Sequence, residues 1–347
     1  MKTSYTNPEE VQLLLKDMTG KVEPVSMEER ARRVANGEYV RSIIIKEYDA
    51  PEEYTRIVKK ALPEYISNVA KYVGVLAEQL YEAKGEKLVL VDIVRAGIPI
   101  GILVRRYINK FYGVKVPHYG VSLVKGLDKE AMQYIIDKHG KDGIQFIDGW
   151  TGKGTVTKEI RNDVAENLPG VDSSLAVLSD PINITKYAGT REDVYIPHSP
   201  LNAAVTGLVS ITVLNPEYKE EGDFHAAIYL DELEKDDISQ WYVDEITNLF
   251  TKQTTSPVGV NDNEDDTLID KLAEKYDRNK KLINPGINEA ARAILRRHLE
   301  KLVVNDLHDD EVKTLIELAE YKGIKVEEDK QLKGYKAVTI ADDNYIR

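Results

Sequence analysis

The sequence predicts an α/β protein in which a doubly wound parallel sheet forms a large domain and a small α/β domain follows it. Short β-branched apolar runs alternate with helical stretches, as in sheets whose strands are buried on both faces. The chain has 347 residues, of which 42% are hydrophobic, enough for one large core and a smaller one. After residue 250 a polar stretch precedes a second set of helix and strand patterns.

The N-terminal part of the chain favours helices. Residues 7–10, NPEE, supply an N-cap, a proline for the first helical position and two acids. Ser26 and Glu29 form a capping box for a second helix. An amphipathic pattern over residues 52–85 predicts a long third helix, with a break or kink near Pro63. We therefore expect a helical N-terminal extension before the sheet.

The strands of the large domain are expected where apolar runs are rich in β-branched residues. Two stretches between them, residues 98–113 and 155–168, have helical patterns. In such sheets ligands bind in the loops beyond the carboxyl ends of the strands. The predicted strands lie at residues 87–93, 119–124, 144–148 and 174–180, and a fifth is considered at 194–196.

The stretch FIDGWTGKGT, residues 146–155, joins a predicted strand to a predicted helix. Its glycine spacing is GxxGxG rather than GxGxxG, and its lysine is followed by glycine where a Walker A loop needs serine or threonine. Glycines, hydroxyl groups and a helix N-terminus can still cradle one phosphate, although an ordinary glycine-rich turn has the same composition. The expected phosphate-binding residues are Thr151, Gly152, Lys153, Gly154 and Thr155.

Acidic and basic residues follow two neighbouring strands. Asp148 ends one strand and can accept hydrogen bonds from sugar hydroxyls or bind a magnesium ion, and Asp92 can contribute to the metal through water or serve a structural role. After the strand that holds Asp92, Arg95, Ala96 and Gly97 form a turn suited to a second anion. Two anion loops on one sheet edge, with a sugar-binding acid between them, predict a ligand with a phosphate at one end and a pyrophosphate at the other.

These loops resemble a known family. VRAGIPIG, residues 94–101, is similar to the pyrophosphate loop of type I phosphoribosyltransferases, and residues 146–155 are similar to their phosphoribosyl-pyrophosphate loop. The wider stretch from about residue 39 to 250 resembles a bacterial phosphoribosyltransferase-like family that is encoded beside tellurite-resistance and stress genes. The resemblance implies a type I phosphoribosyltransferase-like fold for the large domain.

The same resemblance implies roles for individual residues. Arg95, Ala96 and Gly97 would face pyrophosphate, and Asp148 would face the ribose hydroxyls. Lys125 would lie in a mobile loop and supply a cation. The implied catalytic residues are thus Asp148, Arg95 and Lys125. Magnesium is the implied cofactor, with Asp148 and Asp92 as its ligands. One departure is that Ile147 and Gly149 flank a single acid, where ordinary members have two adjacent acids.

Some members of that family carry a cysteine-protease label under the name StiP, and in them a cysteine precedes the residues that match Leu201 and Asn202. This chain has Pro200 at that position and contains no cysteine anywhere. Papain-like chemistry needs a thiol, so we expect none. The net charge is −12, and neither a signal sequence nor an apolar run long enough for a membrane occurs. We expect a cytoplasmic protein.

The last part of the chain resembles the ribosomal L7Ae and Pelota RNA-binding fold. In that fold a GxNE motif opens a helix, and Gly286, Asn288, Glu289 and Arg292 match it. Residues 278–301 hold seven lysines and arginines and two acids, a local balance of +5. Such a patch suits RNA, although an amphipathic helix with a solvated basic face has the same pattern.

The expected function is therefore a phosphoribosyltransferase that makes or modifies a nucleoside-like metabolite. Two alternatives remain open: a non-catalytic regulator that binds a nucleotide or phosphoribosyl pyrophosphate, and an RNA-binding adaptor. The expected partners are phosphoribosyl pyrophosphate or a nucleotide, RNA through the C-terminal domain, and a second copy in a homodimer. The expected divisions are a large domain over residues 1–250, a linker over 251–266 and the C-terminal domain over 267–347.

Overall fold

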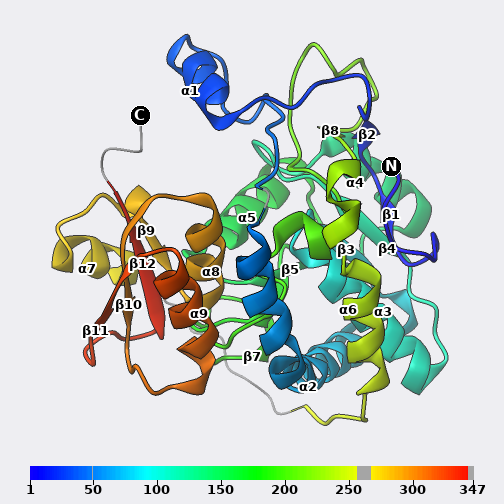
Figure 1. The fold of residues 1–347 in the computed structure, drawn as a ribbon. Helices are drawn as coiled ribbons and strands as arrows, with labels where there is room; N and C mark the ends of the chain where they lie inside the picture. Colours follow the sequence, from blue (N-terminus) through cyan, green and yellow to red (C-terminus); the bar gives the residue numbers. More distant parts are fainter. Residues whose placement is uncertain (49, 256–266, 343–347) are drawn as a thin grey trace.

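The computed structural model describes residues 1–48, 50–255 and 267–342. Its large domain is built on a six-stranded sheet in the order β1-β4-β3-β5-β6-β7, in which every neighbouring pair is parallel (Figure 1). The strands are β1 (Gln12–Leu13), β3 (Val89–Ile93), β4 (His118–Val121), β5 (Ile144–Trp150), β6 (Leu175–Ser179) and β7 (Tyr187–Thr190).

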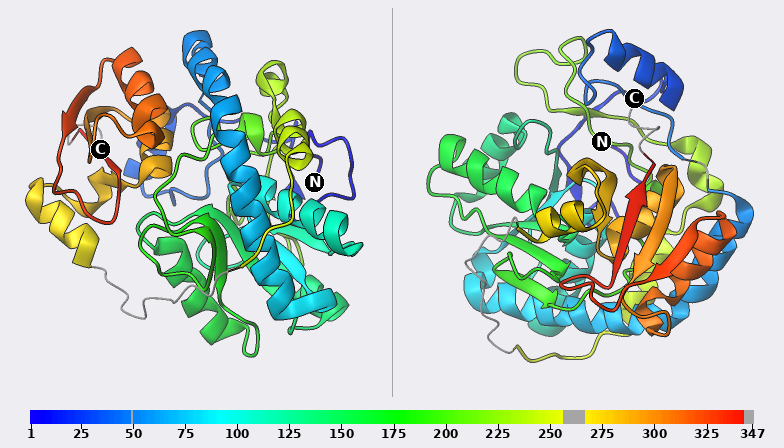
Figure 2. Two further views of the ribbon diagram at one scale, coloured as in Figure 1. Left: turned by 90° about the horizontal axis from the view of Figure 1, so that it is seen from below. Right: turned by 90° about the vertical axis from the view of Figure 1, so that its left-hand side faces the viewer.

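Helices cover both faces of this sheet, because each strand buries alternate side chains on opposite sides (Figure 2). In β3, Leu90 belongs to one apolar core and Val89 and Val91 belong to the other. The first core lies against α2 (Glu52–Lys84), α3 (Gly97–Tyr112) and α6 (Ser239–Asn248), and the second lies against α4 (Lys129–His139) and α5 (Thr155–Asn167).

A small C-terminal domain holds a second sheet, in the order β11-β10-β12-β9. Its helix α8 has a strongly apolar face, and Ile287, Ala290 and Ile294 on that face belong to the same core as α2. A mixed α/β protein with a parallel sheet and a small C-terminal domain is thus confirmed, whereas the type I phosphoribosyltransferase-like fold stays a prediction. The elements are α7 (Thr267–Lys275), β9 (Ile283–Pro285), α8 (Ile287–Arg296), β10 (Leu299–Val304), α9 (Asp310–Tyr321), β11 (Lys325–Glu328) and β12 (Ala337–Ala341).

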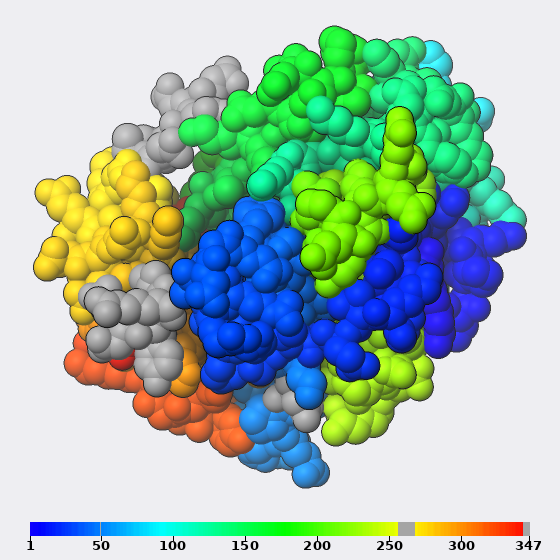
Figure 3. Space-filling model, turned by 90° about the horizontal axis from the view of Figure 1, so that it is seen from above, coloured from blue at the N-terminus to red at the C-terminus, as the bar shows by residue number. Residues whose placement is uncertain are grey.

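Of the three helices predicted in the N-terminal part, the second and third form and the first, after residues 7–10, does not. Residues 7–10 form a turn in which the Asn7 side chain accepts a hydrogen bond from the Glu9 N–H, and the apolar run after it supplies the edge strand β1. Helix α1 (Met27–Ala35) forms as predicted, with Ser26 as its N-cap. Figure 3 shows this N-terminal segment, in blue, lying across one face of the molecule. A short parallel pair, β2 (Lys16–Asp17) and β8 (Ala226–Ala227), completes the region.

Two other local predictions differ from the structure. Helix α2 runs without interruption through Pro63, whose side chain is exposed, so the missing N–H removes one bond without disturbing the buried face. Residues 194–196 do not form a strand. Their backbone groups instead bond to side chains of the C-terminal domain, which replace the strand neighbour that the apolar run would otherwise need.

None of the helices in the described ranges is both long and apolar enough to cross a bilayer. Short 3-10 turns connect several elements of the large domain and one connects α7 to β9. They lie at Gly85–Lys87, Asn202–Val205, Asp231–Asp236 and Lys280–Leu282. Most of the linker predicted over residues 251–266 lies outside the described residues.

Candidate functional site

Asp148 is the acid at the centre of the candidate site. It lies near the end of β5, between the buried residues Ile147 and Gly149, yet it keeps some surface exposed to solvent. Its Oδ1 accepts a hydrogen bond from the Gly149 N–H at 2.8 Å. Burial raises the pKa of Asp148 to about 7, although that hydrogen bond and the charge of Arg292 act in the opposite direction. A carboxyl group that titrates near neutral pH can both give and accept a proton.

Asp92 does not face the same opening. Its carboxylate contacts His118 Nε2, and His118 Nδ1 lies 2.6 Å from the Glu10 carbonyl oxygen, so the pair is closed inside the protein. A β-carbon at Gly101 would lie 2.1 Å from Asp92 Oδ1, which places the pair directly beneath α3. Burial raises the pKa of Asp92 to about 6, against the effect of His118. The geometry fits a structural pair and not a metal ligand.

The described ranges hold no group of three His, Asp or Glu side chains that could bind a metal ion. Asp148 and Asp92, which the sequence analysis assigned to magnesium, do not converge on one opening. The residues of this site therefore do not fit a magnesium ion held by the protein.

Arg95 is held by an ion pair. Its Nη1 donates to the Glu47 carboxylate and to the Val209 carbonyl oxygen, and Arg296 of α8 donates to the other oxygen of Glu47 at 3.1 Å. Burial would raise the pKa of Glu47, but the two guanidinium groups hold it at about 2. Glu47 thus joins the two domains through two arginines, and part of the positive charge predicted for pyrophosphate is already neutralised.

The turn after Arg95 is tight. Ala96 precedes α3, and a β-carbon on Gly97 would lie 2.5 Å from the Ile147 carbonyl oxygen, so only glycine fits between the turn and β5. This close packing brings the turn beside Asp148, as the parallel sheet requires. The assignment of these residues to pyrophosphate stays a prediction.

The loop after β5 serves as a docking surface for the C-terminal domain. The Tyr335 hydroxyl donates to the Gly152 carbonyl oxygen at 2.9 Å, and Lys153 Nζ donates to the Lys280 carbonyl oxygen at 2.5 Å. Gly154 has a φ of +78° and leads into α5, whose first residue, Thr155, is exposed. The predicted phosphate cradle is thus partly covered, and its role in binding phosphate stays a prediction.

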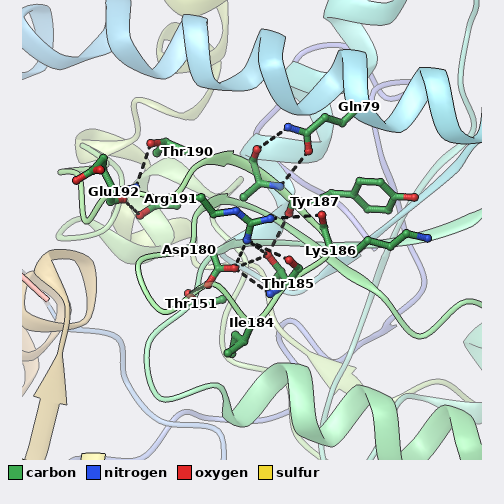
Figure 4. A network of polar contacts seen from close by, with 12 residues as sticks. Gln79, Thr151, Asp180, Ile184, Thr185, Lys186, Tyr187, Thr190, Arg191 and Glu192 are labelled. Atoms are coloured by element: carbon green, nitrogen blue, oxygen red, sulfur yellow. Dashed lines mark hydrogen bonds and ion pairs between the residues drawn. The ribbon is translucent and has the colours of Figure 1, made fainter. Parts of the chain in front are cut away.

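Thr151 belongs to a buried polar network rather than to an open cradle (Figure 4). Its hydroxyl donates to Asp180 Oδ1 at 2.7 Å, and Asp180 Oδ2 accepts from both the N–H and the hydroxyl of Thr185 and from Arg191. These bonds fix the loop after β6 against the loop after β5. Asp180 ends a predicted strand, as Asp148 does, so the argument from strand ends that identified Asp148 could also have identified Asp180.

Lys125 lies in a tight turn that is closed by a bridge between Leu123 and Leu127. Its backbone has a φ of 55°, and its Nζ lies 4.0 Å from the centre of the Tyr39 ring. The next residue, Gly126, donates its N–H to Glu159. The structure therefore places Lys125 against the N-terminal segment and does not bring it together with Asp148.

The four residues of the GxNE match face the large domain. Gly286 has a φ of +90° and precedes α8, and the Asn288 amide accepts from the Ile196 N–H at 2.8 Å and donates to the Val194 carbonyl oxygen at 2.9 Å. Glu289 accepts from the Trp150 indole at 3.0 Å and from Arg292 at 3.0 Å. Both polar ends of Asn288 are thus engaged within the protein, an arrangement that does not favour its predicted reading of RNA bases.

Comparison with known proteins identifies the large domain. Residues 3–247 match the family model described as tellurite-like stress resistance cysteine protease StiP. The chain belongs to the StiP family. It is also 30% identical over 355 residues to "Cysteine protease StiP" of Acinetobacter baylyi, a match that covers 96% of this chain and 92% of that protein. Residues 264–343 match the model of the PELOTA RNA binding domain.

Membership of the StiP family corrects the functional prediction. The family and the Acinetobacter relative are named as cysteine proteases, which are hydrolases, so the prediction of a phosphoribosyltransferase is wrong. The two loops suggested the wrong activity, because glycine-rich turns between a strand and a helix bind many different ligands in α/β proteins. The resemblance to the stress-gene family, by contrast, is confirmed.

This StiP chain nevertheless has no cysteine. The segment that the sequence analysis compared with the family's cysteine holds Pro200, which is buried, and His198 beside it contacts the Tyr242 hydroxyl at 3.2 Å. Burial lowers the pKa of His198 to about 3, so its imidazole is neutral. Thiol chemistry is therefore excluded for this chain.

Three residues of the site escaped the sequence analysis. Asp193 accepts the Ile287 and Lys336 N–H groups, Glu47 joins Arg95 to Arg296, and Tyr335 covers Gly152. No local motif marks any of them, because each acts on a segment 48 or more residues away in the chain.

Proposed function

We propose that this protein is an RNA-binding member of the StiP family. The observation that carries the proposal is the match of its C-terminal residues 264–343 to the PELOTA RNA binding domain. The charge distribution supports it, because residues 278–301 have a local balance of +5 in a chain of net charge −12. Concentrated positive charge on an acidic protein is the usual electrostatic requirement for a nucleic-acid site.

RNA binding by the full chain tests this proposal. We expect fluorescence anisotropy to show saturable binding of labelled single-stranded and stem-loop RNAs, with an affinity that falls as salt rises, because phosphate contacts release counterions. A duplex DNA of equal length is the control for nonspecific attraction. No binding to any RNA at about 50 mM salt would contradict the proposal.

A second candidate function is hydrolysis of an amide bond without a thiol, and the position of Asp148 favours it. Asp148 is only partly buried, is in no ion pair with another described residue, and has its pKa raised to about 7 by burial. As a carboxylate it can take a proton from water while the water oxygen bonds to the amide carbonyl carbon. When the C–N bond breaks, the same proton passes to the departing nitrogen, which leaves an acid and an amine as products.

A panel of fluorogenic peptides and denatured casein tests this second function. We expect the rate to rise with pH through about 7, as Asp148 loses its proton, and Asp148→Asn to reduce it at least 100-fold. Asp142→Asn, which alters an exposed acid of the large domain, is the matched control. Iodoacetamide must not affect the rate, since the chain has no thiol and inhibition would reveal a contaminating protease. Equal rates for Asp148→Asn and wild type would rule out this assignment.

A further inference from the structure

Two cations from different domains are held side by side at the domain junction. Lys153, from the loop after β5, donates to the carbonyl oxygen of Lys280, and Arg297, which follows α8, donates through Nη1 to the next carbonyl oxygen, that of Lys281, at 3.3 Å. Because the two acceptors belong to consecutive residues, the ammonium and guanidinium groups are close neighbours. Within the described part of the chain neither cation is paired with a carboxylate.

The surroundings of this pair hold two further cations and the carboxylate of Glu289. The side chains of Lys280 and Lys281 are exposed beside it, and the nearby acids already have partners. Asp270 pairs with Lys280, and Glu289 accepts from both Trp150 and Arg292. Burial and the charge of Arg297 lower the pKa of Lys153 to about 8, although the carboxylate of Glu289 acts in the opposite direction. An anion placed between the two cations would relieve their repulsion.

We infer that Lys153 and Arg297 together bind a phosphate of RNA, so that the RNA surface spans both domains. The inference rests on the proposed RNA binding and names where the RNA lies. The GxNE residues face the large domain, whereas the cations at the edge of the junction, Lys280, Lys281 and Arg297, are exposed to solvent and open to a polyanion. Lys153 belongs to the loop between β5, which holds Asp148, and α5.

Binding by charge variants of the full chain tests the inference. Lys153→Gln removes the charge but keeps an N–H donor for the Lys280 carbonyl oxygen, so the loop should stay in place. We expect Lys153→Gln and Arg297→Gln each to weaken RNA binding roughly 3- to 10-fold at 0.1 M salt and to reduce the slope of log affinity against log salt by about one. Lys153→Arg should bind as wild type does.

Lys129→Gln is the matched control. Lys129 is an exposed lysine of the large domain that also donates to a neutral oxygen, that of Asn167, at 3.1 Å. If wild type binds RNA and Lys153→Gln binds it equally well with an unchanged salt slope, the inference fails while the proposed function stands. If wild type binds no RNA, the proposed function itself fails. Equal competition by poly-glutamate would overturn the assignment to RNA in favour of an acidic protein.

Discussion

At the scale of single residues, the site is defined by how differently its acids are solvated. Glu47 lies between two guanidinium groups, which hold its pKa at about 2 despite burial. Among the described residues, the hydrogen-bond partner of Asp148 is a backbone N–H, that of Gly149, and burial raises the pKa of Asp148 to about 7. The first acid is a fixed charge that joins two domains, and the second is a group free to exchange a proton. This contrast makes Asp148 the best candidate for chemistry.

The raised pKa of Asp148 predicts a pH-dependent stability. An acid whose folded pKa lies above its unfolded value contributes stability that is complete below the unfolded value of 3.8 and declines as pH rises, until the folded group ionises near 7. Asp148→Asn cannot ionise, so we expect it to be more stable than wild type by about 1 to 3 kcal/mol at pH 8 and equally stable at pH 4. Urea unfolding at both pH values measures the difference.

Asp142→Asn is again the control for this experiment, because it removes the same charge from an exposed position. A gain at pH 8 that is equal in both variants would reflect the net charge of the protein and would refute the special environment of Asp148. A stabilised Asp148→Asn variant that has lost activity would mark an acid retained for function at the expense of stability.

At the scale of secondary-structure elements, the sheet was predictable because its strands are local apolar runs. Strands β3 and β6 lie within the predicted stretches, and β5 begins where predicted and extends beyond residue 148 to Trp150. The parallel order pairs β3 with β5 side by side, as expected. Position at a strand end located Asp148 from the sequence. The helix predicted from the capping signals of residues 7–10 does not form, because the apolar run after them supplies strand β1, which pairs with β4.

What the sequence did not predict are the contacts between distant segments. Residues 194–196 have the composition of a strand, but Asn288 and Glu311 of the C-terminal domain satisfy their backbone groups. Glu47, far from any motif, neutralises the arginine that was expected to meet pyrophosphate. Local propensity cannot predict such partners, because they lie far away in the chain. Here side chains of α8 and α9 take the place of a neighbouring strand.

At the scale of the whole molecule, the two domains behave as one packing unit. The main apolar core continues from α2 of the large domain into α8 and α9, and the Tyr65 hydroxyl donates to the Asp310 carbonyl oxygen at 2.7 Å across the junction. Trp150 of the sheet donates to Glu289 of α8. Because apolar and polar contacts both cross the junction, separation of the domains would expose a large apolar surface to water.

This shared core predicts that loss of one junction side chain weakens the entire protein. Asn288→Ala leaves the Ile196 N–H and the Val194 carbonyl oxygen buried without partners, and we expect it to lower the free energy of unfolding by about 2 to 4 kcal/mol. Tryptophan fluorescence, which includes Trp150 at the junction, and far-UV circular dichroism should fall in one coincident transition. Asn109→Ala, at an exposed position of α3, should change stability by less than about 0.5 kcal/mol. Two separate transitions in wild type, or equal stability of the two variants, would show that the C-terminal domain only rests on the large one.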